Sequence, residues 1–392
     1  MRIILLSTIF FISSLYALTL DEIIEFSLSK NLSLEVIEKR LDANKQNINL
    51  SKQFGNPELL VTTNTLDSSQ PMSQTVMTLK QKLPYYGKRT LNEKVALSED
   101  EVIMQQLKNA KVALVGEIKA EAYTIWELEA LYSITDEYIG LTEKNIALYT
   151  SYAGVNSNLH MGLMKSELSL SELKIQKSSL DAKIRSAYLR LSYLAGTKIE
   201  ELEITLQMGI KPEPIDIQKE LTNTPQVLLK ERELQKQNAL LAKAKRDNYP
   251  DVNLIAGYAY RENFDDYLNL GIGLSLPIYS SEEYKEEKQR LLLLSSKAQK
   301  EDTKESVKAT LEVYYAQMLS SYTIYHIIQD ESLVKLSHMF ELSNSSIAAG
   351  GELFKYIELL FFKLSLEKRA IQSVSNYKQF EAKVAQLKGE IR

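Results

Sequence analysis

One part of the chain alternates apolar residues strictly with small or polar ones. Residues 269–276 carry an apolar side chain at every second position, namely Leu270, Ile272, Leu274 and Leu276. Glycine and serine stand between them, and residues 252–260 alternate in the same way. A period of two is typical of β-strands, and the polar residues 261–266 between the two runs suit a turn. The pattern therefore predicts a β-hairpin over 251–276.

Much of the remaining chain repeats its apolar residues every three or four positions, as helices do. Residues 88–152 contain no proline, so they are expected to form one helix on the order of 95 Å long. A second long helix is expected over 281–343. Returning helices over 165–194 and 352–391 follow glycine-containing tips, which makes each pair a long helical hairpin.

Two proline landmarks recur at one fixed spacing. Pro57 and Pro250 are 193 residues apart, and Pro84 and Pro277 are 193 residues apart as well. Because each landmark pair brackets a segment of similar length, the first half is expected to contain its own β-hairpin, over 58–83. The two halves are therefore interpreted as copies of one structural unit.

Each copy has the same predicted order of elements. A helix comes first, over about 20–54 or about 225–248, and the β-hairpin and the long helical hairpin follow it. We predict a first repeat at 18–210 and a second at 211–392, joined at the proline-rich residues 211–214. The predicted fold class is mainly α with a pair of β-hairpins.

The first 17 residues have the layout of a secretory signal peptide. Arg2 supplies a positive charge, residues 3–16 are mostly apolar, and Ala17 is a small residue at a cleavage point. The alternatives are a buried N-terminal helix or a membrane anchor, although the stretch is short for a spanning helix, which needs about 20 residues. We expect an exported protein whose mature chain begins near Leu18.

Composition argues against several classes of protein. The net charge of −4 gives no sign of the excess positive charge that is typical of nucleic-acid-binding proteins. The absence of cysteine excludes disulfides, thiolate metal sites and a cysteine nucleophile. The three histidines, His160, His326 and His338, lack a converging ligand set, and no phosphate loop, dinucleotide fingerprint or nucleophile elbow is found. We therefore predict no cofactor, no metal centre and no enzymatic activity.

Four strands per chain are too few to close a barrel, because the smallest bacterial barrels have about eight. Three chains would supply twelve strands, so strands that lie in a membrane would require a trimer. The leucine-rich face of 270–276 would then contact lipid, and the glycine-rich face would line water. A soluble β-hairpin packed on a core would show the same alternation and remains the alternative.

Three short motifs carry a family resemblance. They are Leu18-Thr-Leu-Asp-Glu-Ile-Ile24, Gln81-Lys-Leu-Pro-Tyr-Tyr-Gly-Lys-Arg89 and Gly351-Glu-Leu-Phe-Lys-Tyr-Ile-Glu-Leu-Leu360. In this order and spacing they resemble the TolC-like outer-membrane efflux proteins. The turn motif at 81–89 is most similar to members that work with heavy-metal or cation efflux pumps.

The resemblance implies a TolC-like duct in which a trimeric, 12-stranded outer-membrane β-barrel is continued by a periplasmic α-helical barrel. It implies an outer-membrane channel that works passively in a tripartite efflux system. The implied partners are two further copies of the chain, a periplasmic adaptor, an inner-membrane efflux pump and outer-membrane lipid.

The resemblance also implies roles for particular residues. Glu352 and Glu358 match the acidic pore constriction, where threefold symmetry would make rings of carboxylates that attract cations. The alternative for Glu358 is an ordinary solvated helix face. The strand-to-helix turns contain Pro84, Gly87 and Pro277. The tips expected to contact the adaptor contain Gly154, Gly162, Gly350 and Gly351.

Two other classes of protein stay open. A periplasmic adaptor or coiled-coil interaction protein would explain the signal peptide and the helical hairpins, but not two β-hairpins at a fixed spacing. An exported enzyme would need a catalytic constellation that the sequence does not contain. Solubility without detergent would favour either alternative over a membrane duct.

Overall fold

The computed structural model describes residues 18–391 except 66, 68–69, 71, 153–156, 214–220, 222 and 349–352. The chain forms two compact units. Unit 1 comprises Met1–Leu32, Lys111–Ile215 and Thr310–Arg392, and unit 2 comprises Ser33–Ala110 and Asp216–Ala309. Each unit thus combines segments from both halves of the sequence. The predicted signal peptide, 1–17, lies outside the described residues.

The helices of the first half follow the apolar spacing closely. Helix α3 spans Lys88–Tyr152, the predicted bounds, and contributes to both units. The predicted helix over 20–54 is instead two helices, α1 (Leu20–Lys30) and α2 (Leu32–Ser51). The break lies at Asn31, whose backbone is extended and whose side-chain amide donates to the Leu194 carbonyl at 2.8 Å. A short amide side chain that bonds to another segment competes with the helix at this point.

The returning helix of the first half begins earlier than predicted. Helix α4 spans Ser157–Ala195, so Gly162 is a buried residue inside the helix and not part of a loop. The Gly162 carbonyl accepts a hydrogen bond from the Ser166 hydroxyl, one turn further on. One glycine costs a helix only about 1 kcal/mol, which tertiary packing offsets.

The second half contains one conformation that the sequence did not indicate. Helix α6 spans Pro225–Asp247, and the long helix predicted over 281–343 consists of α7 (Ser281–His326), a π-helical turn η1 (Ile327–Ser332) and α8 (Leu333–Ala348). Helix α9 returns over Leu353–Lys388. A π-turn changes the helix register locally but leaves the apolar spacing on either side intact, so the pattern does not show it.

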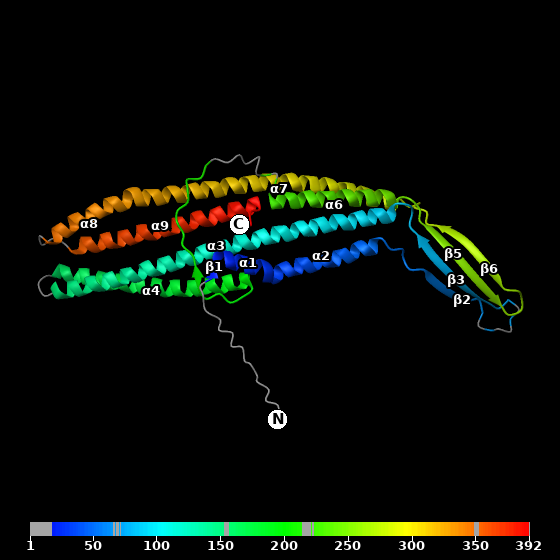
Figure 1. Ribbon diagram of the computed structural model, residues 1–392, viewed down its shortest axis with the longest axis horizontal. Coiled ribbons are helices and arrows are strands. Elements are labelled where there is room, and N and C mark those ends of the chain that lie inside the picture. Colours follow the sequence, from blue (N-terminus) through cyan, green and yellow to red (C-terminus); the bar gives the residue numbers. More distant parts are fainter. Residues whose placement is uncertain are drawn as a thin grey trace, which may run out of the picture. The chain divides into compact units, whose positions relative to one another are not determined.

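The hairpins of the two halves join into one sheet in unit 2. The strands are β2 (Glu58–Thr63), β3 (Gln74–Leu83), β5 (Val252–Arg261) and β6 (Tyr267–Leu274). Their order is β2-β3-β5-β6, and every neighbouring pair is antiparallel (Figure 1). In unit 1, the two-residue strands β1 (Leu18–Thr19) and β4 (Leu202–Glu203) form a small parallel pair that the sequence did not predict.

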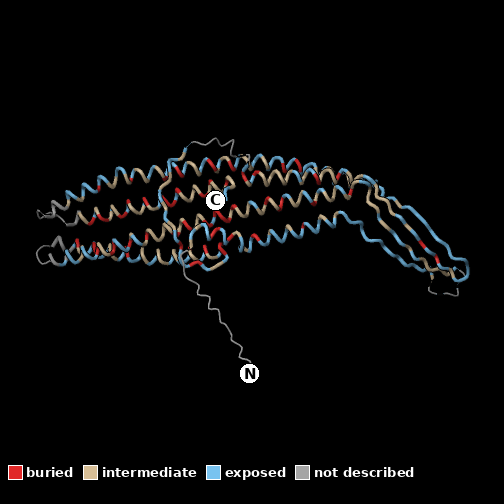
Figure 2. The backbone as a smooth tube through the Cα atoms, viewed as in Figure 1, coloured by how far each residue is buried: buried red, intermediate tan, exposed pale blue. Residues whose placement is uncertain are grey.

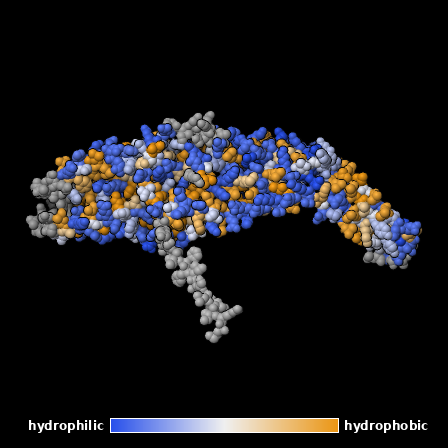
Figure 3. Space-filling view, in the orientation of Figure 1, coloured by the Kyte–Doolittle hydropathy of each residue, from blue (hydrophilic) through white to orange (hydrophobic). Residues whose placement is uncertain are grey.

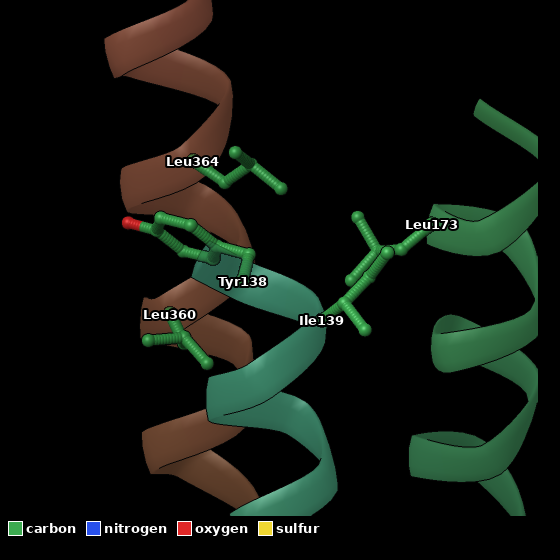
Figure 4. Close-up of a cluster of buried hydrophobic side chains, with 5 residues drawn as sticks. All are labelled: Tyr138, Ile139, Leu173, Leu360 and Leu364. Carbon is green, nitrogen blue, oxygen red and sulfur yellow. The ribbon is translucent and has the colours of Figure 1, made fainter. Parts of the chain in front are cut away.

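The helices of unit 1 pack as a layer in the order α4, α3, α9 and η1–α8. Tyr138 and Ile139 are neighbours on α3 but point to opposite sides (Figure 4). Tyr138 packs against Leu360 and Leu364 of α9, and Ile139 packs against Leu173 of α4. On its other side, α9 contacts η1 and α8 through a cluster that contains Ile328, Leu336 and Leu366. Figure 2 shows the buried residues as short repeated stretches along these helices.

The repeat is also visible in the backbone conformation. Four described residues have a positive φ, and they form two pairs 193 positions apart: Gly87 with Ser280, and Gly196 with Gly389. Gly196 and Gly389 follow the ends of α4 and α9. At each end the glycine N–H donates to the carbonyl three residues back, and the next N–H donates to the carbonyl five residues back, as in a Schellman motif. The repeat boundaries themselves remain a prediction.

Leu364→Ala should lower the free energy of unfolding by about 2–5 kcal/mol, because it removes buried methyl groups from the contact with Tyr138 and leaves a cavity. Phe362→Ala is the matched control, because Phe362 lies on the same helix but is exposed, and a change below about 0.5 kcal/mol is expected. The measurement is denaturant unfolding of the purified protein in detergent. Equal losses for both variants would contradict the assigned packing.

Candidate functional site

The sheet of unit 2 carries an apolar face that no described element covers. The strand registers bring the following side chains to this face: Leu59, Val61, Met77, Leu79, Leu254, Tyr258, Leu268, Leu270, Ile272 and Leu274. All of them are exposed, and Leu270 reaches 86%. Apolar residues gather over the sheet in Figure 3. Burying so much apolar surface would release free energy, so this face needs an apolar environment.

The opposite face of the sheet carries mainly small and polar residues, together with the apolar side chains of Leu60, Val76, Ile255 and Tyr267. Gly257 and Ala259 are buried there, and Gly271 and Gly273 lie on the neighbouring strand. The same face carries Thr78 and the charged residues Glu58, Lys80, Lys82 and Arg261. A sheet of a water-soluble domain places its apolar face on the core and its polar face in solvent. Here the apolar face is bare, which reverses that arrangement.

Both edges of the sheet are open within the described chain. Strand β2 pairs only with β3, and strand β6 pairs only with β5. Since every pair is antiparallel, β2 and β6 run in opposite directions. Each edge presents a row of unpaired N–H and C=O groups, which another strand can satisfy. The edges could therefore pair with each other in an antiparallel manner, from one copy of the chain to the next.

A charged contact joins the β3–α3 turn to the start of β5. Asp251 accepts the Tyr85 backbone N–H at 3.0 Å and lies 2.8 Å from the Lys88 ammonium. Lys82 lies 3.1 Å from the second carboxylate oxygen. The Lys88 side chain is nearly buried and also donates to the Tyr249 carbonyl at 2.7 Å. Although burial raises the pKa of Asp251, the hydrogen bonds from Lys88, the Tyr85 backbone and Lys82 lower it overall.

Aromatic rings complete this turn. Tyr85 stacks on Tyr249 with ring centroids 4.9 Å apart, and the Arg246 guanidinium lies 5.5 Å and 5.4 Å from the two centroids. Gly87 has φ +86°, and a Cβ atom there would lie 3.2 Å from the Arg246 guanidinium. The positive φ favours glycine at position 87, and a side chain there would also displace the Arg246 guanidinium slightly. Pro84 ends β3 one residue before this contact.

The equivalent turn of the second half lacks these contacts. Strand β6 ends at Leu274, so Leu276 lies beyond the strand that was predicted to contain it, although its side chain is exposed. The Ser275 N–H still donates to the Asp251 carbonyl, in line with the ladder, but Pro277 has no N–H with which to extend the pairing further. Ser280, which corresponds to Gly87, has φ +50°.

The predicted constriction and tips are described only in part. Glu358 lies on α9 and its carboxylate is half exposed, 3.3 Å from the ammonium of Lys165 on α4. Glu352, Gly154, Gly350 and Gly351 lie outside the described residues. Gly162, as noted above, is buried in α4. Of the two predicted constriction residues, Glu358 is the one within the described residues, and its partner is a cation.

Unit 1 contains an open cavity that sequence reasoning missed. Its volume is about 850 Å³, and its lining includes Trp126, Gly209, Tyr325, His326 and Glu367. The carbonyl of Ile210, one of the lining residues, accepts a hydrogen bond from the Tyr377 hydroxyl at 2.7 Å. The residues come from α3, α7, α9 and the segment after β4, so only tertiary contacts reveal the cavity. The lining contains no hydrogen-bonded nucleophile and base of the kind that covalent catalysis requires.

The described residues of the structure lack two further features. No group of three or more His, Cys, Asp or Glu side chains within them is placed to hold a metal ion. No helix within them combines the length and apolar character needed to cross a membrane. His326 packs against Tyr322 with ring centroids 4.3 Å apart and lies 3.0 Å from Asp330 on the following turn.

No family model matches the chain, but one curated relative does. The chain is 23% identical over 284 residues to the cobalt-zinc-cadmium resistance protein CzcC of Cupriavidus metallidurans. The match covers 67% of this chain and 63% of CzcC, so it spans less than two thirds of that relative.

Solved structures match over nearly the whole chain. CusC aligns with a TM-score of 0.81 at 12% identity, over 95% of this chain and 92% of CusC. The outer membrane protein VceC of Vibrio cholerae aligns with a TM-score of 0.79 at 14% identity, over 95% of this chain and 96% of VceC. The open state of the Neisseria gonorrhoeae MtrE outer membrane channel aligns with a TM-score of 0.79 at 15% identity, over 95% of this chain and 89% of MtrE. The chain therefore has the fold of the TolC-like outer-membrane channels, as its motifs predicted.

Asp251→Asn should destabilise unit 2, because it leaves the nearly buried Lys88 ammonium without a counter-ion. We expect the variant to unfold at a lower temperature at pH 6. The Asp251 pKa is lower in the folded chain than in the unfolded chain, so its contribution is fully present above the ordinary value of 3.8 and is lost as pH falls through the folded value. The difference between variant and wild type should therefore shrink below pH 3.8.

The matched control is Asp42→Asn, which breaks the exposed pair of Asp42 with Lys45. Exposed pairs contribute little, so its unfolding temperature should stay at the wild-type value. Thermal unfolding followed by circular dichroism from pH 6 downwards measures both variants. A constant difference for Asp251→Asn at every pH would contradict the assigned role of the carboxylate.

Proposed function

We propose that this protein is the outer-membrane channel of a tripartite efflux system. It forms a homotrimeric duct through which substrates pass passively after an inner-membrane pump and a periplasmic adaptor deliver them. The observation that carries the proposal is the four-stranded sheet, with its bare apolar face and two open edges. The shared fold with outer-membrane channels supports the same conclusion.

The sheet becomes a stable structure when three copies close it. Three chains supply twelve strands, an even number as in other bacterial outer-membrane barrels. Edge strands β6 and β2 run in opposite directions, so pairing β6 of one copy with β2 of the next continues the antiparallel order. Closure satisfies the edge N–H and C=O groups, which have no water partners in lipid. The apolar face meets lipid, and the small, polar face lines a water-filled lumen.

The helices continue the duct into the periplasm. The fold supplies long helices from both halves, and in unit 1 they form a single layer that a ring of three copies can close. The helix tips are the surfaces that meet the adaptor and the pump. No catalytic group is required, because the pump supplies the energy for transport.

The proposed cargo is cationic. The relative CzcC is named for cobalt, zinc and cadmium resistance, and the turn at 81–89 resembles members that work with cation pumps. Glu358 is the described candidate for the acidic constriction, and Glu352 remains a predicted one. The Lys165 ammonium beside Glu358 offsets part of its charge. The ring of three Glu358 carboxylates would therefore attract cations more weakly than carboxylates without a cationic neighbour do.

The competing hypothesis is a periplasmic adaptor, and the exposed apolar face of the sheet argues against it. An adaptor works in water, where the exposed leucines and isoleucine of β6 would cost free energy and promote aggregation. A membrane duct gives the same residues a lipid environment.

The test of the proposal begins with expression in a Gram-negative host. The full chain, with its predicted signal peptide, is the form to express; the exported product should fractionate with outer membranes, require detergent for extraction and run as a trimer by light scattering. A monomer that is soluble without detergent would overturn the duct.

Two lysine variants test which face of the sheet meets lipid. Ile272→Lys places a charge on the apolar face, where an ammonium near the bilayer midplane costs about 2–4 kcal/mol per chain. We expect much less trimer in the outer membrane, measured by quantitative immunoblotting. Asn269→Lys is the control, because residue 269 is also exposed on β6 but belongs to the polar face. Equal loss in both variants would contradict the assigned orientation.

Substitutions of Glu358 and Lys165 should change the ion selectivity of the channel in opposite directions. Removing the carboxylate with Glu358→Ala should lower the ratio of cation to anion permeability. Removing the ammonium with Lys165→Ala should raise it, because the carboxylate loses its cationic partner. Reversal potentials of the channel in planar bilayers measure the ratio. Unchanged potentials in both variants would mean that Glu358 does not face the pore.

A further inference from the structure

The cavity of unit 1 has an aromatic wall. Three large rings border it, those of Trp126 on α3 and of Tyr322 and Tyr325 on α7. His326 extends the wall, because its ring centroid lies 4.3 Å from that of Tyr322 and 5.6 Å from that of Tyr325. The face of an aromatic ring carries partial negative charge and attracts cations. Within the described chain, no lysine or arginine stacks on Trp126, Tyr322 or Tyr325, so these rings do not already hold a cation.

A carboxylate borders the same cavity. Glu367 on α9 belongs to the lining, and its side chain is 25% exposed. One of its oxygens accepts the Tyr138 hydroxyl at 2.7 Å, and the other lies 3.5 Å from the Lys363 ammonium. The first contact fixes the position of the carboxylate, whereas the second is longer than a normal N–H···O hydrogen bond. Since a carboxylate has about four lone-pair sites, Glu367 can accept a further cationic group.

The remaining wall is the backbone segment 206–211, which follows β4 and crosses the helices of unit 1 (Figure 1). Gly209 lies directly against the ring of Tyr377 on α9, and a Cβ atom at position 209 would overlap that ring. A side chain there would push the segment away from α9, so glycine sets the depth of the cavity. The resulting volume of about 850 Å³ suits a small organic molecule.

The second repeat departs from the first at this cavity. Tyr322 and Glu367 stand where the first repeat, 193 residues earlier, has Glu129 and Lys174. The π-turn η1 contributes Gln329 to the lining, whereas the equivalent stretch 134–139 of α3 is ordinary α-helix. Such turns often occur at functional sites. The first repeat folds without these features, so helix packing alone does not explain them.

We propose that this cavity binds an organic cation, an ammonium or an aromatic cation of the size of a typical drug. Its charge lies beside Glu367, and its body lies against the rings of Trp126 and Tyr322. A metal ion fits poorly, because it needs several ligands and the described lining offers one carboxylate. Lys211 also borders the cavity, but it is exposed, so its ammonium can stay in water. The site is formed within one chain and goes beyond the channel function proposed above.

The fluorescence of the protein reports directly on this cavity, because Trp126 is the single tryptophan of the chain. The probe is N-benzylpyridinium, an aromatic cation whose pyridinium ring quenches indole fluorescence on contact. It is titrated at pH 8 into the exported protein, extracted in a non-ionic detergent. We expect quenching that saturates with the probe concentration. The isomer 4-benzylpyridine, which is uncharged at this pH, should not displace the probe at equal concentration.

Three variants assign the binding to named groups. Glu367→Gln removes the charge but keeps an oxygen that can accept the Tyr138 hydroxyl, and it should weaken binding by at least about tenfold. Tyr322→Leu removes one ring and should weaken binding about threefold or more. Glu358→Gln is the matched control, because it makes the same change on the same helix outside the cavity, and its affinity should equal that of the wild type. Circular dichroism checks that each variant is folded.

The outcomes separate the cation site from the channel. Quenching that does not saturate, or unchanged affinity in both Glu367→Gln and Tyr322→Leu, would overturn the site. An equal loss in Glu358→Gln and Glu367→Gln would place the probe elsewhere and overturn it too. Displacement by 4-benzylpyridine would overturn the cationic class of the ligand. A protein that shows the expected affinities but runs as a monomer would keep the cation site and overturn the duct.

Discussion

The requirement to pair backbone groups at the edges of an apolar-faced sheet governs this protein. A four-stranded sheet whose leucine and isoleucine side chains point outward is unstable in water, and its unpaired edges are intolerable in lipid. Both problems have one solution, which is closure with other copies of the chain in a membrane. In the trimer that we propose, association is part of folding, so the stability of the protein would depend on subunit concentration.

The duplicated plan explains how one chain supplies four of the twelve strands of the proposed barrel. Each half contributes two strands and a long helical hairpin. The duplication is not symmetric in its chemistry. The turn at Gly87 is held by Asp251, Lys88 and stacked tyrosines, whereas the corresponding turn at Ser280 has no such network in the chain. The strong polar contact lies within the chain.

The arrangement of charge along the duct suits a passive channel. Ion pairs on the helices are mostly exposed and contribute little to stability, so they can rearrange at small cost when the helices move. The half-exposed Glu358 and Lys165 pair lies on the returning helices of both repeats, at positions that are themselves 193 residues apart. If Glu358 lines the pore as we propose, this exposed pair would modulate the field of the pore without forming a tight cation site.

Much of the local structure could be predicted from the sequence, because periodicity and chain-breaking residues act over short distances. The bounds of α3, the two hairpins and the outward-facing leucines of β6 follow from the period of the apolar residues. The break at Asn31, the π-turn at 327–332, the helical placement of Gly162 and the end of β6 before Leu276 do not, because each depends on a contact or on a local register that the apolar spacing does not contain.

By itself the sequence determined the secondary structure, the duplicated order of elements and the family resemblance. Only the tertiary structure decided which surfaces remain bare, that Glu358 has a lysine partner and that Asp251 holds the turn. These properties arise between residues more than a hundred positions apart, and no pattern along a single segment records which distant side chains will meet.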